Sequence, residues 1–227
     1  MSDPRLIVGL DLPTADEARR MVDTLGDAVS VYKVGLTLLA GEGVALSREL
    51  RAAGKAVFQD WKLHDIGAQV AGAVRAVSAG GCDLLTVHAE PQVMEAAVRG
   101  RSGGLKILAV TVLTSLGADE LREIGYELPV QALVERRVRQ AIEAGCDGVV
   151  ASPREAGLAR ALGGPDFLVV TPGVRPRGSG VDDQVRVATP AEALRHGASH
   201  LVVARPVLRA ADPRAAALRI LDEMAAA

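Results

Sequence analysis

The segment SAGGCDLLTVHAEP, residues 78–91, decides the fold, because its plan returns twice further along the chain. It reads as the end of a helix, glycine, a small and a polar residue, an apolar strand and then a polar loop. EAGCDGVVASPRE (143–155) and RHGASHLVVARPV (195–207) follow the same plan. Glycine commonly forms the cap that ends a helix. The glycines in that place are Gly80 or Gly81, Gly145 and Gly197.

Short β-branched runs of the same kind recur along the whole chain, and helical patterns separate them. We predict eight strands, at residues 6–11, 31–35, 56–62, 84–88, 105–113, 148–152, 167–173 and 200–205. They are nearly continuous in apolar residues, which is typical of parallel strands buried on both faces. Eight such units predict an α/β fold, a single (β/α)8 TIM barrel over residues 1–227. A doubly wound open sheet is the rival, but the glycine-rich first turn of that fold is missing.

The composition excludes several other classes of protein. Of the 227 residues, 49% are hydrophobic and only 2% aromatic, so aliphatic side chains must fill the core. The net charge is −2 and the charges are scattered, so neither a nucleic-acid nor a membrane partner is expected. No signal peptide fits before the first strand, and no apolar run reaches transmembrane length. Cys82 and Cys146 lack metal-ligand spacing and are expected to be buried free thiols, so we predict a soluble cytoplasmic protein.

Charged residues gather at the end of the third predicted strand, in FQDWKLHDIGAQV (58–70). Asp60 and Lys62 are two positions apart, so in a strand they point to the same face. If that face is the barrel interior, each charge needs a partner, and Lys33 on the neighbouring strand can approach Asp60 from the other side. Asp65 lies just beyond the strand, where an N-cap for a helix from Ile66 and a functional role are equally good interpretations.

Other polar residues also fall where strands end, and in a TIM barrel these ends face the active site. A lone lysine at a strand end is more often simply solvated, and His64 and His88 are read as surface or structural residues. The irregular segment 172–184 is the longest in the chain, and we interpret it as a lid. The strand-end residues are Asp11, Lys33, Asp60, Lys62, His88, Thr114, Arg175 and Arg205.

In these residues the chain resembles the orotidine 5'-monophosphate decarboxylase family over nearly its whole length. The central motif is D-x-K-x-x-D-I, here from Asp60 to Ile66. Six further motifs occur in the family's order: GLDLP with Asp11, YKVGL with Lys33, TVLTS with Thr114, VTPGVRP with Arg175, D-Q with Gln184 and R-P with Arg205. The chain departs from the family at Gly67-Ala68-Gln69, where Pro-Asn-Thr is usual, and at Ala204, where glycine is usual.

The resemblance implies a TIM-barrel enzyme that converts orotidine 5'-monophosphate to uridine 5'-monophosphate without cofactor or metal. Lys62 is implied as proton donor within a network of Lys33, Asp60, Lys62 and Asp65. It also implies a homodimer in which Asp65 reaches the partner's site. The implied substrate-binding residues are Asp11 and Lys33 for the ribose, Thr114 for the pyrimidine, and Arg175, Gln184 and Arg205 for the phosphate.

Two other functions remain open from the sequence. Metal-dependent sugar-phosphate decarboxylases and aldolases share D-x-K-x-x-D, but they typically carry glutamate where this chain has Lys33. An ammonium there would repel Mg²⁺, which favours the metal-free branch. A phosphosugar-binding barrel without catalysis is the other alternative, although a binder does not need four interior charges.

Overall fold

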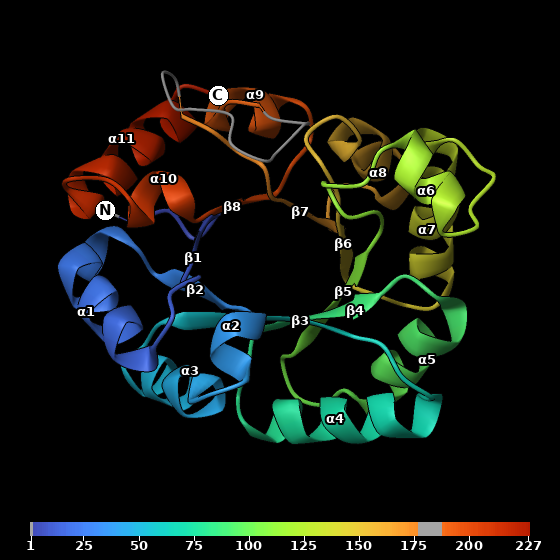
Figure 1. Ribbon diagram of the computed structural model, residues 1–227, viewed down its shortest axis with the longest axis horizontal. Coiled ribbons are helices and arrows are strands. Elements are labelled where there is room, and N and C mark those ends of the chain that lie inside the picture. The colour runs from blue at the N-terminus through green and yellow to red at the C-terminus, as the bar shows by residue number, and fades with distance from the viewer. Residues whose placement is uncertain (1, 177–187) are drawn as a thin grey trace.

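Eight parallel strands close into a barrel in the order β1 to β8, with helices on the outside (Figure 1). This computed structural model describes residues 2–176 and 188–227. The TIM barrel predicted from the sequence is therefore confirmed. The strands are β1 (Leu6–Gly9), β2 (Val31–Val34), β3 (Ala56–Leu63), β4 (Leu84–His88), β5 (Lys106–Val110), β6 (Gly148–Val150), β7 (Leu168–Thr171) and β8 (His200–Val203).

The helices follow the strands along the chain and form the outer layer. The longest are α1 (Ala15–Leu25), α3 (Gly43–Ala52), α4 (Gly67–Ala79), α5 (Pro91–Gly100), α7 (Val130–Glu143), α8 (Ala156–Gly163) and α11 (Pro213–Ala225). The short ones are α2 (Leu36–Leu39), α6 (Ala118–Glu123), α9 (Pro190–Arg195) and α10 (Arg205–Leu208), with a 3-10 turn at Gly26–Ala28. No helix in the described part of the chain is long and apolar enough to cross a membrane.

All eight predicted strands are present, but several end earlier than the apolar runs that predicted them. The run 105–113 is a strand only to Val110, which pairs with His88 on one side and Val150 on the other. Both neighbouring strands end at those partners, so the residues beyond have no strand to pair with. Val112 is nevertheless buried, because burial at the barrel mouth does not require strand pairing.

The alternation of side chains along the strands produces two separate cores. A large cluster lies between the barrel and its helices and includes Leu6, Val8 and Tyr32. A smaller cluster fills the inside of the barrel, since strands buried on both faces need two cores. The buried members of this inner core are Ile7, Val31, Phe58, Leu84, Leu108, Val170 and Val202.

The predicted helix ends and thiols are also as the sequence indicated. Gly81, Gly145 and Gly197 adopt positive φ after their helices, and Gly80 caps α4. Cys82 and Cys146 are free and buried, and burial raises the pKa of their thiols to about 11 and about 12. Both thiols are therefore protonated at neutral pH and unreactive.

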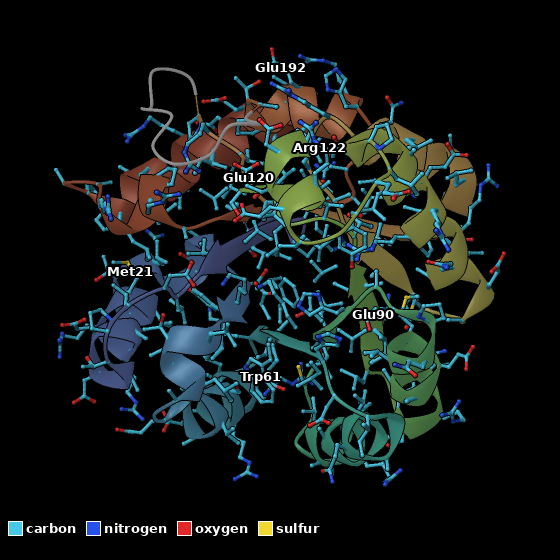
Figure 2. All side chains as sticks on the ribbon, turned by 45° about the vertical axis from the view of Figure 1, so that its right-hand side comes forward. Met21, Trp61, Glu90, Glu120, Arg122 and Glu192 are labelled. Carbon is cyan, nitrogen blue, oxygen red and sulfur yellow. The ribbon has the colours of Figure 1, made fainter. Side chains whose placement is uncertain are left out.

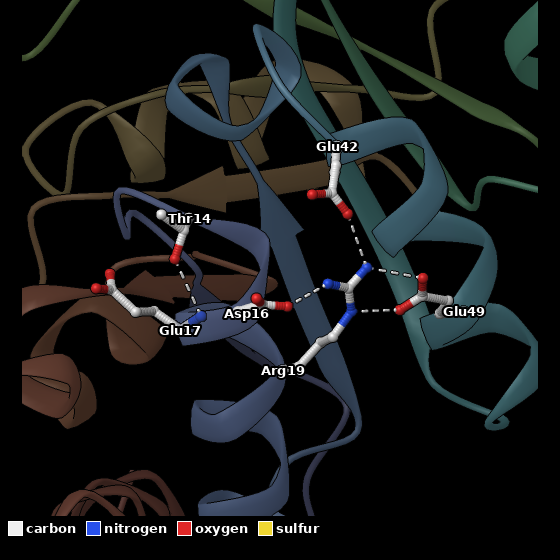
Figure 3. A network of polar contacts seen from close by, with 6 residues as sticks. All are labelled: Thr14, Asp16, Glu17, Arg19, Glu42 and Glu49. Carbon is white, nitrogen blue, oxygen red and sulfur yellow. Dashed lines mark hydrogen bonds and ion pairs between the residues drawn. The ribbon is translucent and has the colours of Figure 1, made fainter.

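A cluster of ion pairs on the outer surface joins helix α1 to helix α3 (Figure 3). The Arg19 guanidinium of α1 donates to Asp16, to Glu42 just before α3, and to both oxygens of Glu49 within α3. It holds the pKa of the Glu49 carboxyl below its usual range. The pairs are solvent-exposed, so they orient α1 against α3 more than they stabilise the fold.

We predict that Gly148→Ala destabilises the barrel by about 1–3 kcal/mol, because the added carbon overpacks β6 against β7. A Cβ at Gly148 would lie only 2.2 Å from the backbone oxygen of Leu168. Gly104→Ala is the matched control, since a Cβ there meets nothing within 4 Å. Urea unfolding of both variants measures the difference. Equal midpoints for the two variants would show that the close approach is not limiting.

Candidate active site

A cavity of about 300 Å³ opens at the carboxyl end of the barrel strands. This is the end at which TIM barrels carry their active sites. Phe58, Val110, Val150 and Val202 give the cavity apolar walls that continue into the inner core. The polar residues predicted from the sequence that line it are Asp11, Lys33, Asp60, Lys62, Thr114, Arg175 and Arg205.

Four of these side chains form a continuous row of alternating charge across β1, β2 and β3. The Lys33 ammonium donates to Asp11 at 2.8 Å and lies 3.6 Å from Asp60 Oδ2. The Lys62 ammonium donates to Asp60 Oδ1 at 2.8 Å. The Lys33 side chain is only 9% exposed and that of Asp60 15%, so these charges are held largely out of water. The sequence-based prediction that Lys33 approaches Asp60 from the side opposite Lys62 is confirmed.

Asp60 lies between the two ammonium groups, and this position controls its ionisation. Burial alone would raise the pKa of its carboxyl. The positive charges of Lys33 and Lys62, with hydrogen bonds from Lys62 and Thr86, more than offset burial and hold that pKa below its usual value. Asp60 is therefore a carboxylate at neutral pH.

The backbone of β3 is irregular at the site. Its register against β4 runs from Gln59 opposite Leu85 to Leu63 opposite Val87, so β3 uses four steps where β4 uses two. Within this bulge Lys62 adopts φ +50°, and it is the one non-glycine residue with positive φ in the part of the chain described. Bulges frequently re-aim side chains next to active sites.

Thr86 on β4 is a site residue that the sequence analysis missed. Its hydroxyl accepts a hydrogen bond from the Lys62 backbone N–H at 2.9 Å and donates to Asp60 Oδ1 at 3.0 Å. Threonine is common in strands, so Thr86 gives no signal within LLTVH. The one signal in the sequence is a polar residue within an apolar strand, close to the strand's carboxyl end and next to the strand that carries Asp60 and Lys62.

The residues that alternate with Asp60 and Lys62 face away from the cavity, as predicted. Gln59, Trp61 and Leu63 lie between β3 and the helices α3 and α4, where Figure 2 marks Trp61 on the outer side of the strand. His64 and His88 are absent from the cavity lining. The His64 ring lies 3.0 Å from a Glu90 oxygen (Glu90 is marked in Figure 2) and packs against His88. Burial, followed by the nearby His64, lowers the pKa of His88.

Asp65 lies apart from the charge row within its own chain. It is exposed, it is not among the cavity-lining residues, and its Oδ1 accepts from the adjacent Ile66 N–H at 2.6 Å. The alternative interpretation of Asp65 as an N-cap is wrong. Ile66 occupies the cap position of α4, the helix begins at Gly67, and no side chain caps it. The turn after β3 is one residue longer than that interpretation required.

Arg175 and Arg205 lie on the β7 and β8 side of the cavity. Arg175 is buried and its Nη1 donates to the carbonyl of Val174, while Arg205 is the first residue of α10. Ala204, where glycine is usual in the family, has a negative φ of −122°, so its backbone is not in the left-handed region that favours glycine. Gln184 and most of the predicted lid, 172–184, lie outside the described residues. Within residues 2–176 and 188–227, no three His, Cys, Asp or Glu side chains are grouped to hold a metal.

Comparisons with known proteins agree with the barrel fold and point to one family. The family model described as "Orotidine 5'-phosphate decarboxylase / HUMPS family" matches residues 4–220. An orotidine 5'-phosphate decarboxylase of Caulobacter sp. (strain K31) is 64% identical, over 99% of this chain and 98% of that protein. One of Methylobacterium radiotolerans is 52% identical, over 99% of both. The crystal structure of the Lactobacillus acidophilus orotidine 5'-phosphate decarboxylase superimposes with a TM-score of 0.85 at 36% identity, over 98% of this chain and 99% of that one.

We predict that Asp60 makes stability depend on pH in the acid range. Its pKa is lower in the folded than in the unfolded chain, where it is near 3.8. Its contribution is therefore complete above that value and is lost as pH falls through the folded pKa. Between about pH 5 and pH 3, the free energy of unfolding should fall more steeply for the wild type than for Asp60→Asn, which cannot ionise. Parallel urea-unfolding curves over that range would contradict the assignment.

Proposed function

The chain belongs to the orotidine 5'-phosphate decarboxylase / HUMPS family, and from this premise we propose that it decarboxylates orotidine 5'-monophosphate to uridine 5'-monophosphate in pyrimidine synthesis. The observation that carries the proposal is the row of alternating charge from Asp11 to Lys62 at the mouth of the barrel. The reaction creates negative charge at one carbon, and this row ends in a cation.

The reaction requires electrostatic stabilisation of negative charge at one atom, C6 of the orotate ring. Loss of CO₂ from C6 of the orotate ring leaves an electron pair in the ring plane, where the π system cannot delocalise it. A fixed positive charge close to C6 lowers the energy of that state. Because the charges are already held by one another, little reorganisation is needed during the reaction.

We assign the proton transfer to Lys62. As the C6–CO₂ bond breaks, the electron pair stays on C6, and the Lys62 ammonium stabilises it and then gives it a proton. The neutral amine regains its proton from water. Asp60 holds the Lys62 ammonium in place before the reaction, since the two are joined at 2.8 Å.

The remaining residues hold the substrate. Asp11 and Lys33, joined at 2.8 Å beside the charge row, bind the ribose hydroxyls. Thr114, after β5, faces the pyrimidine. Arg175 and Arg205, with Gln184, bind the phosphate, for which guanidinium groups are well suited. Binding energy from phosphate contacts remote from C6 can lower the barrier to decarboxylation.

We further propose a homodimer in which Asp65 completes the partner's site. Two apolar side chains at the barrel mouth support this: Leu36, at the start of α2, is 57% exposed and Ile66, next to Asp65, is 68% exposed. A two-fold interface over this mouth would bury both and would carry each Asp65 toward the other chain. A cytoplasmic location is proposed with it, because free buried thiols suit a reducing compartment.

A metal-dependent sugar-phosphate decarboxylase is the second candidate, since members of the wider family share D-x-K-x-x-D. The position of Lys33 argues against it. Its ammonium lies between the Asp11 and Asp60 carboxylates, the place that a divalent ion would need. A cation already present there would repel the metal.

We predict turnover of orotidine 5'-monophosphate that is unchanged by EDTA. The loss of orotate absorbance measures it directly, with added Mg²⁺ as the comparison. The reason is that Lys33 supplies the charge that a metal would otherwise bring. A requirement for Mg²⁺, or turnover of a keto-sugar phosphate alone, would favour the second candidate.

We predict that Lys62→Ala and Asp65→Ala homodimers are each nearly inactive, whereas a mixture regains activity after dissociation and reassociation. In a mixed dimer one site carries both lesions and the other carries neither. Random pairing makes half of the dimers mixed, each with one intact site, so about a quarter of wild-type activity should return. Mass spectrometry verifies the mixed dimers. If they form and activity stays at the level of the parents, Asp65 does not act in the partner's site.

A further inference from the structure

Thr86 lies behind the charge row, buried in the barrel wall. It lies on β4 opposite the β3 bulge, is 0% exposed and does not line the cavity. It therefore cannot touch a substrate. Its one hydroxyl nevertheless bonds to the two residues on which the proposed reaction depends most, Asp60 and Lys62.

The bulge explains why a hydroxyl is needed here. Within the bulge β3 advances four residues while β4 advances two, so the Lys62 N–H has no regular strand partner. A buried N–H without an acceptor is costly. Thr86 Oγ1 accepts this bond at 2.9 Å and so holds Lys62 in its left-handed conformation.

The same hydroxyl also fixes the carboxylate. Having accepted from the Lys62 backbone, Thr86 Oγ1 directs its own hydrogen to Asp60 Oδ1 at 3.0 Å. That oxygen also accepts from the Lys62 ammonium. Thr86, Asp60 and Lys62 thus close a small ring of hydrogen bonds that joins the lysine backbone to its own ammonium group.

We propose that Thr86 is a positioning residue for decarboxylation, which holds the Lys62 backbone and the Asp60 carboxylate so that the ammonium group is aimed into the cavity. This role rests on the proposed function and extends it to a residue on a fourth strand. It acts on the reaction step and not on substrate binding, because Thr86 is outside the cavity wall.

Two pairs of variants isolate the hydroxyl. Thr86 and Thr86→Val have nearly the same shape and differ in the hydroxyl, as do Thr86→Ser and Thr86→Ala. The proposal predicts that each loss of the hydroxyl lowers kcat on the order of 10- to 100-fold, as expected when a buried N–H is left without its partner. KM should change by less than about 3-fold, since binding contacts are retained. Thr86→Ser should retain most of the activity.

Thr171→Val is the matched control. Thr171 is also a 0% exposed threonine on a barrel strand, but its hydroxyl has no hydrogen-bond partner in the part of the chain described. Its kcat should stay near that of the wild type. Emission of Trp61, the single tryptophan, and thermal unfolding verify the fold of every variant. If Thr86→Val does not fold, the Ser and Ala pair decides.

Three outcomes overturn the proposal. One is a kcat near wild type in folded Thr86→Val or Thr86→Ala. Another is a loss of activity that Thr86→Ser shares in full, since packing and not the hydroxyl would then matter. The third is a loss that lies in KM alone.

Amide hydrogen exchange of a peptide covering residues 58–64 separates this proposal from the proposed function. Loss of the hydroxyl should speed exchange at Lys62, whatever the substrate, while Thr86→Ser and Thr171→Val should behave as wild type. If the wild type does not turn over orotidine 5'-monophosphate, the proposed function fails, and faster exchange in Thr86→Val still supports Thr86 as the residue that holds the bulge. Unchanged exchange overturns it.

Discussion

The site depends on one carboxylate that holds two ammonium groups apart. Asp60 lies between Lys33 and Lys62, with Lys62 joined to Oδ1 and Lys33 close to Oδ2. Without it two largely buried cations would face each other, and an uncompensated buried charge costs about 3–5 kcal/mol. The same pairing that makes the lysines tolerable in the barrel also fixes where their charges lie. Stability and preorganisation therefore come from one interaction.

The barrel divides the cavity into two halves with different tasks. Strands β1 to β3 supply the charged row, and β4 supports it from behind through Thr86. Residues on and after β5 to β8 supply most of the apolar wall, and the two arginines follow β7 and β8. Because neighbouring strands are consecutive in the sequence, the charged half is built from the first 90 residues and the half with the two arginines from the rest. A substrate with its reacting ring and its phosphate at opposite ends fits this division.

The sequence predicted those features that follow from local periodicity. Alternation along β3 placed Asp60 and Lys62 inside and Trp61 outside, and the repeat of strand and helix gave the barrel. The features that it did not predict depend on pairing between strands. Thr86 and the bulge are visible only once β3 and β4 are in register. The sequence analysis placed the start of α4 at Ile66, one residue too early. An aspartate after a strand can either cap a helix or lie in the turn before it, and the local sequence does not distinguish the two.

The strained conformation of Lys62 raises the question of what maintains it. A non-glycine residue at positive φ costs of the order of 1–3 kcal/mol, so it persists only where the surroundings determine it fully. Here β3 is anchored on both faces, by Phe58 in the inner core and by Trp61 against the outer one. The ends of the bulge are fixed by pairing with β4, and its middle by the Thr86 hydroxyl. The lysine therefore keeps its left-handed backbone while its ammonium stays on Asp60. The packed barrel core thus supplies the rigidity that the charged row needs.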